Sequence, residues 1–214
     1  MAYGKEMKRL NPCGDAEILA LLQIFCPGAQ NILDAGCGRG DRLAALRAAL
    51  PEAALWGIEL EEENAKAART ACPQAEILNG DLCALPWGAE SFDLVLCECT
   101  LSLTEPEAAL RELRRVLRPG GMLLLGDLCA EGQAAPAQLD CGTVRRLFFR
   151  DWLETQFRRQ GFLPRQYTDC REALLTMAAQ MIFDGSFCCV DAGAAAALKE
   201  YRATYGLWLL EKEA

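Results

Sequence analysis

The sequence of 214 residues contains no histidine. This absence excludes Ser–His–Asp and Cys–His catalysis, and any imidazole general base, because all of these need a ring nitrogen that titrates near neutral pH. Twelve cysteines are present, but no two of them have the C-x-x-C spacing, so the usual zinc-finger patterns are missing as well. No resident metal is therefore expected, and the chemistry has to proceed without a histidine proton shuttle.

The sequence also lacks a long apolar run and a basic surplus. No apolar stretch reaches the length of about eighteen residues that a membrane-spanning helix requires. Residues 1–15 carry charges without the apolar segment of a signal peptide, so we expect a cytoplasmic protein with mostly reduced cysteines. The net charge is −8, which disfavours nucleic acid as a partner. We expect a small-molecule substrate and no membrane partner. The oligomeric state is left open.

Strand-like and helix-like segments alternate along most of the chain. Strands are expected over 31–36, 54–60, 75–79, 92–99, 122–128, 163–168 and 205–212, and helices over 15–25, 41–50, 61–71, 105–117, 150–160, 170–182 and 192–203. This order predicts an α/β fold with a doubly wound, mostly parallel sheet of about seven strands and helices on both faces. The strand 205–212 is expected to be the antiparallel partner in a late hairpin.

The length fits a single domain, 1–214. Within it, residues 1–30 are expected to form a lid and first helix, residues 31–128 a cofactor-binding core, and residues 129–214 the substrate side. A polar loop is expected over 129–142, and the longer segment 129–150 is expected to close over the substrate together with residues 1–14.

The segment ILDAGCGRGD, residues 32–41, joins the first strand to a helix through a glycine-rich turn. A Walker A loop would need Lys and Ser or Thr at fixed places, and these are missing. A dinucleotide site would need GxGxxG, whereas the spacing here is GxGxG and Asp41 stands in the third glycine's place. An NAD-dependent reductase on a similar sheet is therefore the weaker alternative.

Acidic residues follow three successive strands, at Asp34, Glu59 and Asp81. Because ligands of such sheets bind at the carboxyl ends of the strands, these carboxylates are expected to face one ligand. Glu59 is placed to accept hydrogen bonds from ribose hydroxyls, and a set of acids suits a cationic ligand better than a phosphorylated one. Each acid also has a structural alternative, as a turn residue or an acid at a helix N-terminus.

The segments ILDAGCGRGD, GIEL, NGDLCALPW, FDLVLCE and LRELRRVLRPGGMLLLGDL resemble, in order and spacing, the motifs of class I S-adenosylmethionine-dependent methyltransferases with a type 11-like domain. The resemblance covers residues 30–130 well and implies a Rossmann-like methyltransferase fold. It assigns S-adenosylmethionine as cofactor and S-adenosylhomocysteine as product. It implies cofactor contacts from Asp34, Ala35, Gly36, Cys37, Gly38 and Gly40 to the methionine part, Glu59 and Leu60 to the ribose, Asp81 and Leu82 to the adenine, Cys97 beside the ligand, and Gly14 in the leader segment 11–14 over the methionine carboxylate.

Methyl transfer to a small-molecule acceptor mainly requires the nucleophile, methyl carbon and sulfur to be held in line. A hydroxyl acceptor also needs a general base, and Glu98, directly after the fourth strand, is the best-placed candidate. Asp127 and the tyrosines are the other groups that could do this work. The alternative for Glu98 is an acid that contacts a ligand or solvent and moves no proton.

Cysteines gather in the segments expected near the methyl donor. CECTLSL and LDCGTVRRLF resemble, more weakly, the thiol positions of arsenite methyltransferases. That resemblance implies that Cys99 and Cys141, with Cys13, bind a thiophilic or metalloid substrate. The alternative is that these cysteines are small buried hydrophobic residues. A binding protein for S-adenosylmethionine that has lost catalysis is the remaining alternative to an enzyme.

Overall fold

The computed structural model describes residues 11–141, 144–183 and 198–213. The helices are α1 (Asp15–Phe25), α2 (Asp41–Ala49), α3 (Glu62–Ala71), α4 (Pro106–Val116), α5 (Arg150–Arg159) and α6 (Arg171–Phe183), with short 3₁₀ turns η1 (Leu82–Ala84) and η2 (Leu101–Leu103). The strands are β1 (Asn31–Ala35), β2 (Ala54–Glu59), β3 (Glu76–Asn79), β4 (Phe92–Glu98), β5 (Leu117–Ala130), β6 (Ala137–Cys141), β7 (Val144–Phe149), β8 (Phe162–Asp169) and β9 (Thr204–Lys212). All seven predicted strands and six of the seven predicted helices are present among the described residues, and β5 is longer at both ends than expected.

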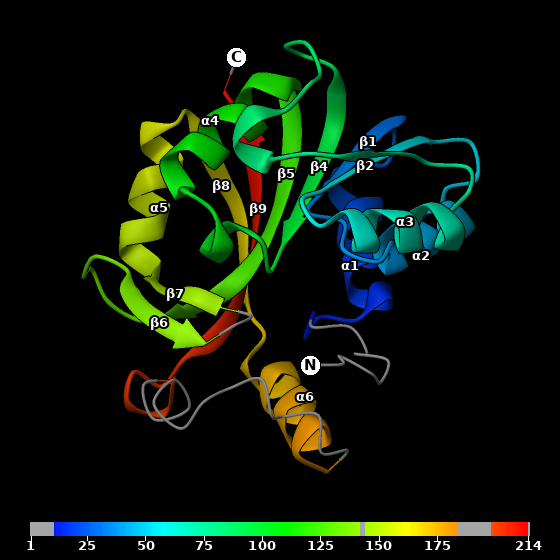
Figure 1. Ribbon diagram of the computed structural model, residues 1–214. Helices are drawn as coiled ribbons and strands as arrows, with labels where there is room; N and C mark the ends of the chain where they lie inside the picture. The colour runs from blue at the N-terminus through cyan, green and yellow to red at the C-terminus, as the bar shows by residue number, and fades with distance from the viewer. Residues whose placement is uncertain (1–10, 142–143, 184–197, 214) are drawn as a thin grey trace.

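The main sheet has the order β3-β2-β1-β4-β5, with all of these strands parallel. β9 then pairs antiparallel with both β5 and β8, so the late hairpin is confirmed. These seven strands are the predicted ones. The doubly wound α/β class is also confirmed, because the crossover helices lie on both faces (Figure 1).

The predicted loop over 129–142 is wrong in part, because β6 lies within it. β6 pairs antiparallel with β7, and β7 runs parallel to the end of β5 through the pairs Cys129↔Phe148 and Ala130↔Phe149, which gives a nine-stranded sheet. The proposed lid 129–150 thus contains a hairpin. The helix expected over 192–203 falls partly outside the described residues, which show helix only at 198–200.

Two apolar layers cover the sheet. On one face, α4 and α5 pack with Leu110, Leu113 and Phe157 against alternate residues of the central strands, and on the other face α1, α2 and α3 do the same. β4 shows the alternation directly, since Val95 belongs to the first layer and Leu96 to the second. Burial on both faces explains the near-continuous apolar sequence of this strand.

The parallel strands bring their carboxyl ends to one edge of the sheet. Asp34, Glu59 and Glu98 stand at or next to the ends of β1, β2 and β4, which are neighbours in the order β2-β1-β4. Asp127 lies near the end of β5, the next strand along.

In the described part of the chain, no helix is both long and apolar enough to cross a bilayer.

Candidate active site

The turn between β1 and α2 is built from three glycines with left-handed backbone angles. Gly36 has φ +85°, and a Cβ there would lie 2.3 Å from the hydroxyl oxygen of Thr100. Gly40 has φ +86°, and its Cβ would lie 2.8 Å from the Cα of Ala68. Gly38 has φ +53° and open space around it, so a ligand can approach its backbone closely.

Glu59 closes the same turn from the neighbouring strand. Its two carboxylate oxygens accept hydrogen bonds from the backbone N–H of Gly38, at 2.9 Å, and of Glu61, at 3.0 Å. These bonds fix the half-buried carboxylate beside the glycine turn. Because a carboxylate offers about four acceptor positions, it retains capacity for ligand hydroxyls.

Among the described residues, Asp34 is one of three buried acids at this edge of the sheet, with Glu98 and Asp127. Its side chain is 4% exposed at the end of β1. Burial, and then the negative charges of Glu98 and Glu59, raise the pKa of Asp34 to about 7, while Arg42 opposes the shift. The acids expected on neighbouring strand ends therefore influence one another, as a shared site requires.

Asp81 is exposed after β3. It caps the 3₁₀ turn η1 by accepting a hydrogen bond from the backbone N–H of Cys83 at 2.8 Å. This contact is the structural alternative foreseen for Asp81, that of a turn residue. Leu82, the next residue, is buried in the apolar layer, whereas Leu60 after Glu59 is 65% exposed.

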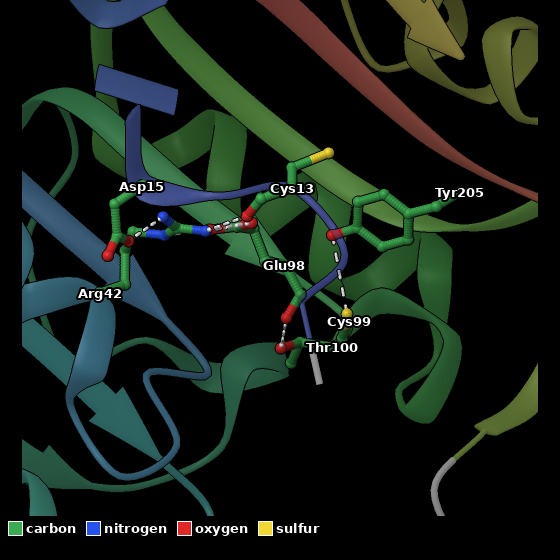
Figure 2. A network of polar contacts seen from close by, with 7 residues as sticks. All are labelled: Cys13, Asp15, Arg42, Glu98, Cys99, Thr100 and Tyr205. Atoms are coloured by element: carbon green, nitrogen blue, oxygen red, sulfur yellow. Dashed lines mark hydrogen bonds and ion pairs between the residues drawn. The ribbon is translucent and has the colours of Figure 1, made fainter. Parts of the chain in front are cut away.

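A buried ion pair crosses the site, and sequence reasoning missed its cationic member. Arg42, in α2, is 5% exposed and donates hydrogen bonds to both carboxylate oxygens of Glu98, at 2.7 and 3.0 Å. It also bonds Asp15 at the start of α1 and the backbone carbonyl of Cys13 (Figure 2). The guanidinium therefore ties the leader segment and α1 to the end of β4.

This pairing argues against the general-base prediction for Glu98. A carboxylate held on both oxygens by a guanidinium has its negative charge stabilised and is a weak base. Asp127 is buried as well, and burial raises its pKa to about 6, although the backbone N–H groups of Ser102 and Leu128 donate hydrogen bonds to it. The general-base role of Glu98 stays a prediction, and the structure shows this residue as the buried ion-pair partner of Arg42.

The cysteines that were expected to act together have different described contacts. Cys13 contacts Cys170, with the two sulfur atoms 2.7 Å apart. Cys99 donates toward the hydroxyl of Tyr205 at 3.6 Å (Figure 2). Cys97 is fully buried in the apolar layer. Cys141 ends β6, and its side chain lies outside the described residues.

Three further predicted contacts occupy different environments. Ala35 and Cys37 are buried, whereas Gly14 is exposed as the N-cap of α1. Cys37 lies against Gly57 of β2, and it therefore packs under the turn. Cys170 and Tyr205 were not predicted, because both come from the loosely patterned C-terminal third of the chain.

A separate surface groove of about 520 Å³ lies between α4 and the β6–β7 hairpin. Arg111, Arg146 and Trp152 are among its lining residues, and none of the predicted cofactor residues is. This groove is therefore distinct from the glycine turn and its acids.

A doubly wound sheet with a glycine turn after its first strand and acids along the carboxyl edge is typical of folds that bind a nucleotide or nucleoside ligand there. Residues 33–125 match the family model described as a methyltransferase domain. Over these residues, somewhat less than half of the chain, the protein is similar to class I S-adenosylmethionine-dependent methyltransferases. This similarity agrees with the resemblance drawn from the motifs and argues against the alternative of an NAD-dependent reductase.

Characterised and uncharacterised relatives share this domain. The chain is 34% identical over 113 residues to the malonyl-[acyl-carrier protein] O-methyltransferase of Herminiimonas arsenicoxydans, which covers 53% of this chain and 41% of that protein. It is 36% identical over 136 residues to the uncharacterized methyltransferase YodH of Bacillus subtilis (strain 168), with 60% and 56% covered. The chain thus spans only about half the length of these relatives.

Solved structures share the fold over nearly the whole chain. The geranyl diphosphate C-methyltransferase of Streptomyces coelicolor A3(2), solved with Mg²⁺, geranyl diphosphate and S-adenosyl-L-homocysteine, matches with a TM-score of 0.74, 14% identity and coverage of 92% of this chain and 80% of that one. The [4+2]-cyclase SpnF matches with a TM-score of 0.69, 22% identity and coverage of 94% and 82%. Since one of these neighbours is a [4+2]-cyclase, the fold alone does not define the reaction.

Proposed function

We propose that this protein transfers the methyl group of S-adenosylmethionine to a small-molecule acceptor. The observation that supports this most is the cluster of Asp34 and Glu59 around the open backbone at Gly38. A buried acid with a raised pKa is costly to the fold unless a cationic ligand uses it. A dinucleotide would bring a pyrophosphate against these charges instead.

The residues present fit the donor by their chemistry. Glu59 would hold the ribose hydroxyls, Asp81 with Leu82 the adenine, and Asp34 the ammonium group. When bound, S-adenosylmethionine supplies a methyl group on a sulfonium, which is already a good leaving group. The chain's contribution is then to orient donor and acceptor and to exclude water.

Arg42 has a positioning role in this proposal. By bonding Glu98, Asp15 and the carbonyl of Cys13, it holds the leader segment against the site. Gly14 follows Cys13 directly and would face the methionine carboxylate. Where the acceptor is a hydroxyl, Asp127 is the more suitable proton acceptor, since its pKa of about 6 leaves it mostly ionised at neutral pH.

A thiophilic or metalloid acceptor is the finer hypothesis. In its favour, Cys99 lies directly after β4 and Cys13 lies in the leader. Against it, the partner of Cys13 is Cys170, and the contact made by Cys99 is with Tyr205. Turnover with arsenite and with a panel of thiols, measured as transfer of labelled methyl groups, tests this hypothesis.

Ligand binding tests the proposal at its first step. Thermal-shift titration of the full chain with S-adenosylhomocysteine, NAD and ATP should raise the melting temperature with the first compound alone. Asp81→Ala should weaken that response, while Glu76→Ala, an exposed acid at the opposite end of β3, serves as the matched control. Stabilisation by NAD in place of S-adenosylhomocysteine would refute the proposal.

Catalysis is tested separately from binding. A chain that binds S-adenosylhomocysteine but transfers no methyl group to any member of a broad acceptor panel would favour the non-catalytic alternative. Spontaneous donor hydrolysis without a protein is the baseline for that assay.

A further inference from the structure

Two cysteines and a glutamate from three parts of the chain meet beside α1. Cys13 precedes α1, Glu17 lies in its first turn, and Cys170 directly precedes α6. The two sulfur atoms and one carboxylate oxygen all lie within 4.8 Å of one another. Cys13 and Cys170 are 2% and 5% exposed, and both are free thiols.

This set is the only group of three such ligand atoms among the described residues. Sulfur ligands of Zn²⁺ stand about 2.3 Å from the metal, and a carboxylate oxygen about 2.0–2.2 Å. Two sulfurs of a tetrahedral site are consequently nearly 4 Å apart, so the 2.7 Å contact has to open by about 1 Å on binding. The distance of 4.0 Å between Cys170 Sγ and a Glu17 oxygen already suits a shared ion.

The electrostatic surroundings also favour a cation. The carboxylates of Glu17 and Glu98 both place negative charge near the Cys13 thiol. The same negative charges attract a divalent cation, which would displace the thiol protons. Glu17 is exposed, and it provides a route by which an ion can enter from solvent.

We propose that Cys13, Glu17 and Cys170 form a binding site for a thiophilic divalent cation such as Zn²⁺, with water in the fourth position. Binding forms two metal–thiolate bonds and one metal–carboxylate bond and releases two thiol protons to solvent, with no change in oxidation state. Two thiolates select a soft or borderline ion over Mg²⁺ or Ca²⁺.

Such an ion would fasten the leader to the C-terminal half of the chain. The carbonyl of Cys13 accepts from Arg42, and the backbone N–H of Cys170 donates to the carbonyl of Tyr205 in β9. The cation would therefore link the ion pair of the candidate active site to the sheet. This inference concerns a separate site, and metal binding can be measured whether or not the methyltransferase proposal is correct.

Co²⁺ added to the fully reduced, metal-free full chain tests the site. We expect one equivalent to bind with sulfur-to-metal charge-transfer absorption and tetrahedral visible bands, and Zn²⁺ to displace it. Cys13→Ser and Cys170→Ser should each lower the affinity at least about tenfold, and Glu17→Gln about tenfold. Cys26→Ser, which changes another thiol at the end of α1, should leave affinity and stoichiometry unchanged.

Two results would overturn the proposal. One is Co²⁺ binding of equal affinity in the parent chain and in both cysteine variants. The other is a fully reduced, folded parent chain that takes up no Co²⁺. Circular dichroism of each variant separates loss of the site from loss of the fold.

Discussion

The two ends of β4 each carry an acid, and the two acids have opposite surroundings. Asp93, near the amino end, is half-buried and accepts hydrogen bonds from the backbone N–H groups of Gln30 and Asn31, and Arg118 pairs with it. These contacts outweigh its partial burial and lower the pKa of Asp93. At the carboxyl end, Glu98 is buried and held by Arg42, beside Asp34 and its raised pKa.

We interpret this difference as one between acids that serve the fold and acids that the proposed function assigns to a ligand. The amino-end carboxylate is stabilised by the fold and lies at the surface, where its charge costs little. The carboxyl-end acids are buried together, which costs the fold free energy because like charges repel and water is excluded. A folded chain keeps such an arrangement where a ligand uses it.

The largest expected effect is on stability. Arg42→Met leaves Glu98 buried without its main cationic partner and should lower the free energy of unfolding by about 3–5 kcal/mol. Arg118→Met, which removes the partner of Asp93 at the other end, should cost no more than about 1 kcal/mol. Urea unfolding followed by circular dichroism measures both, and equal losses would remove the contrast between the two ends.

The second-largest expected effect is on the pH dependence of stability, to which Asp34 and Asp93 should contribute with opposite signs. The pKa of Asp34 is raised to about 7 in the folded chain, so between about pH 4 and 7 the folded chain binds a proton that the unfolded chain has lost. The stability associated with protonated Asp34 is therefore present at acidic pH and is lost as the pH rises through 7. Asp34→Asn should flatten this dependence, by up to about 4 kcal/mol, in urea titrations between pH 4.5 and 8.

Asp93→Asn should change the pH dependence of stability in the opposite direction. Because the pKa of Asp93 is lowered on folding, its contribution is present above its unfolded pKa and lost as the pH falls. If Asp34→Asn left the pH dependence of stability unchanged, the pKa of Asp34 would not be raised in the folded chain, and this prediction would be contradicted.

Ligand affinity should show a smaller effect in free energy. Glu59→Gln replaces a charged acceptor by a neutral one and should weaken S-adenosylhomocysteine about tenfold to a hundredfold, or about 1.4–3 kcal/mol. Glu76→Gln, an exposed acid at the start of β3, should bind like the parent chain. Calorimetric titration at constant ionic strength gives both values, and equal affinities would contradict the ribose assignment of Glu59.

The smallest effect is expected at the amino end itself. Asp93→Asn removes the ion pair with Arg118 but keeps an oxygen for the backbone N–H of Asn31, so it should cost about 1 kcal/mol of stability or less. It should leave the affinity for S-adenosylhomocysteine unchanged, because Asp93 lies at the far end of the sheet. A loss of affinity in this variant would mean that the two ends of β4 are coupled.

Much of the fold followed from local sequence patterns. The strands β1 to β5 and their helices have strong apolar periodicity. The turn after β1 requires positive φ angles, which glycine adopts most readily. The positions of Asp34 and Glu59 at strand ends followed from the same periodicity. Their roles as ligand contacts remain predictions.

Other features depend on contacts between distant segments. The role of Arg42 could not be predicted from local sequence, because its partner Glu98 is 56 residues away. Cys170 was not predicted for the same reason, with 157 residues between it and Cys13. The β6–β7 hairpin has weak alternation of its own, and it is positioned by pairing with the end of β5.

A crystal structure of the full chain with S-adenosylhomocysteine is the most direct test of the central claim. We predict ribose hydroxyls within hydrogen-bonding distance of the Glu59 carboxylate and the ligand's ammonium group next to Asp34. A ligand bound elsewhere, for example in the groove beside Arg111 and Trp152, with the glycine turn empty, would contradict the account.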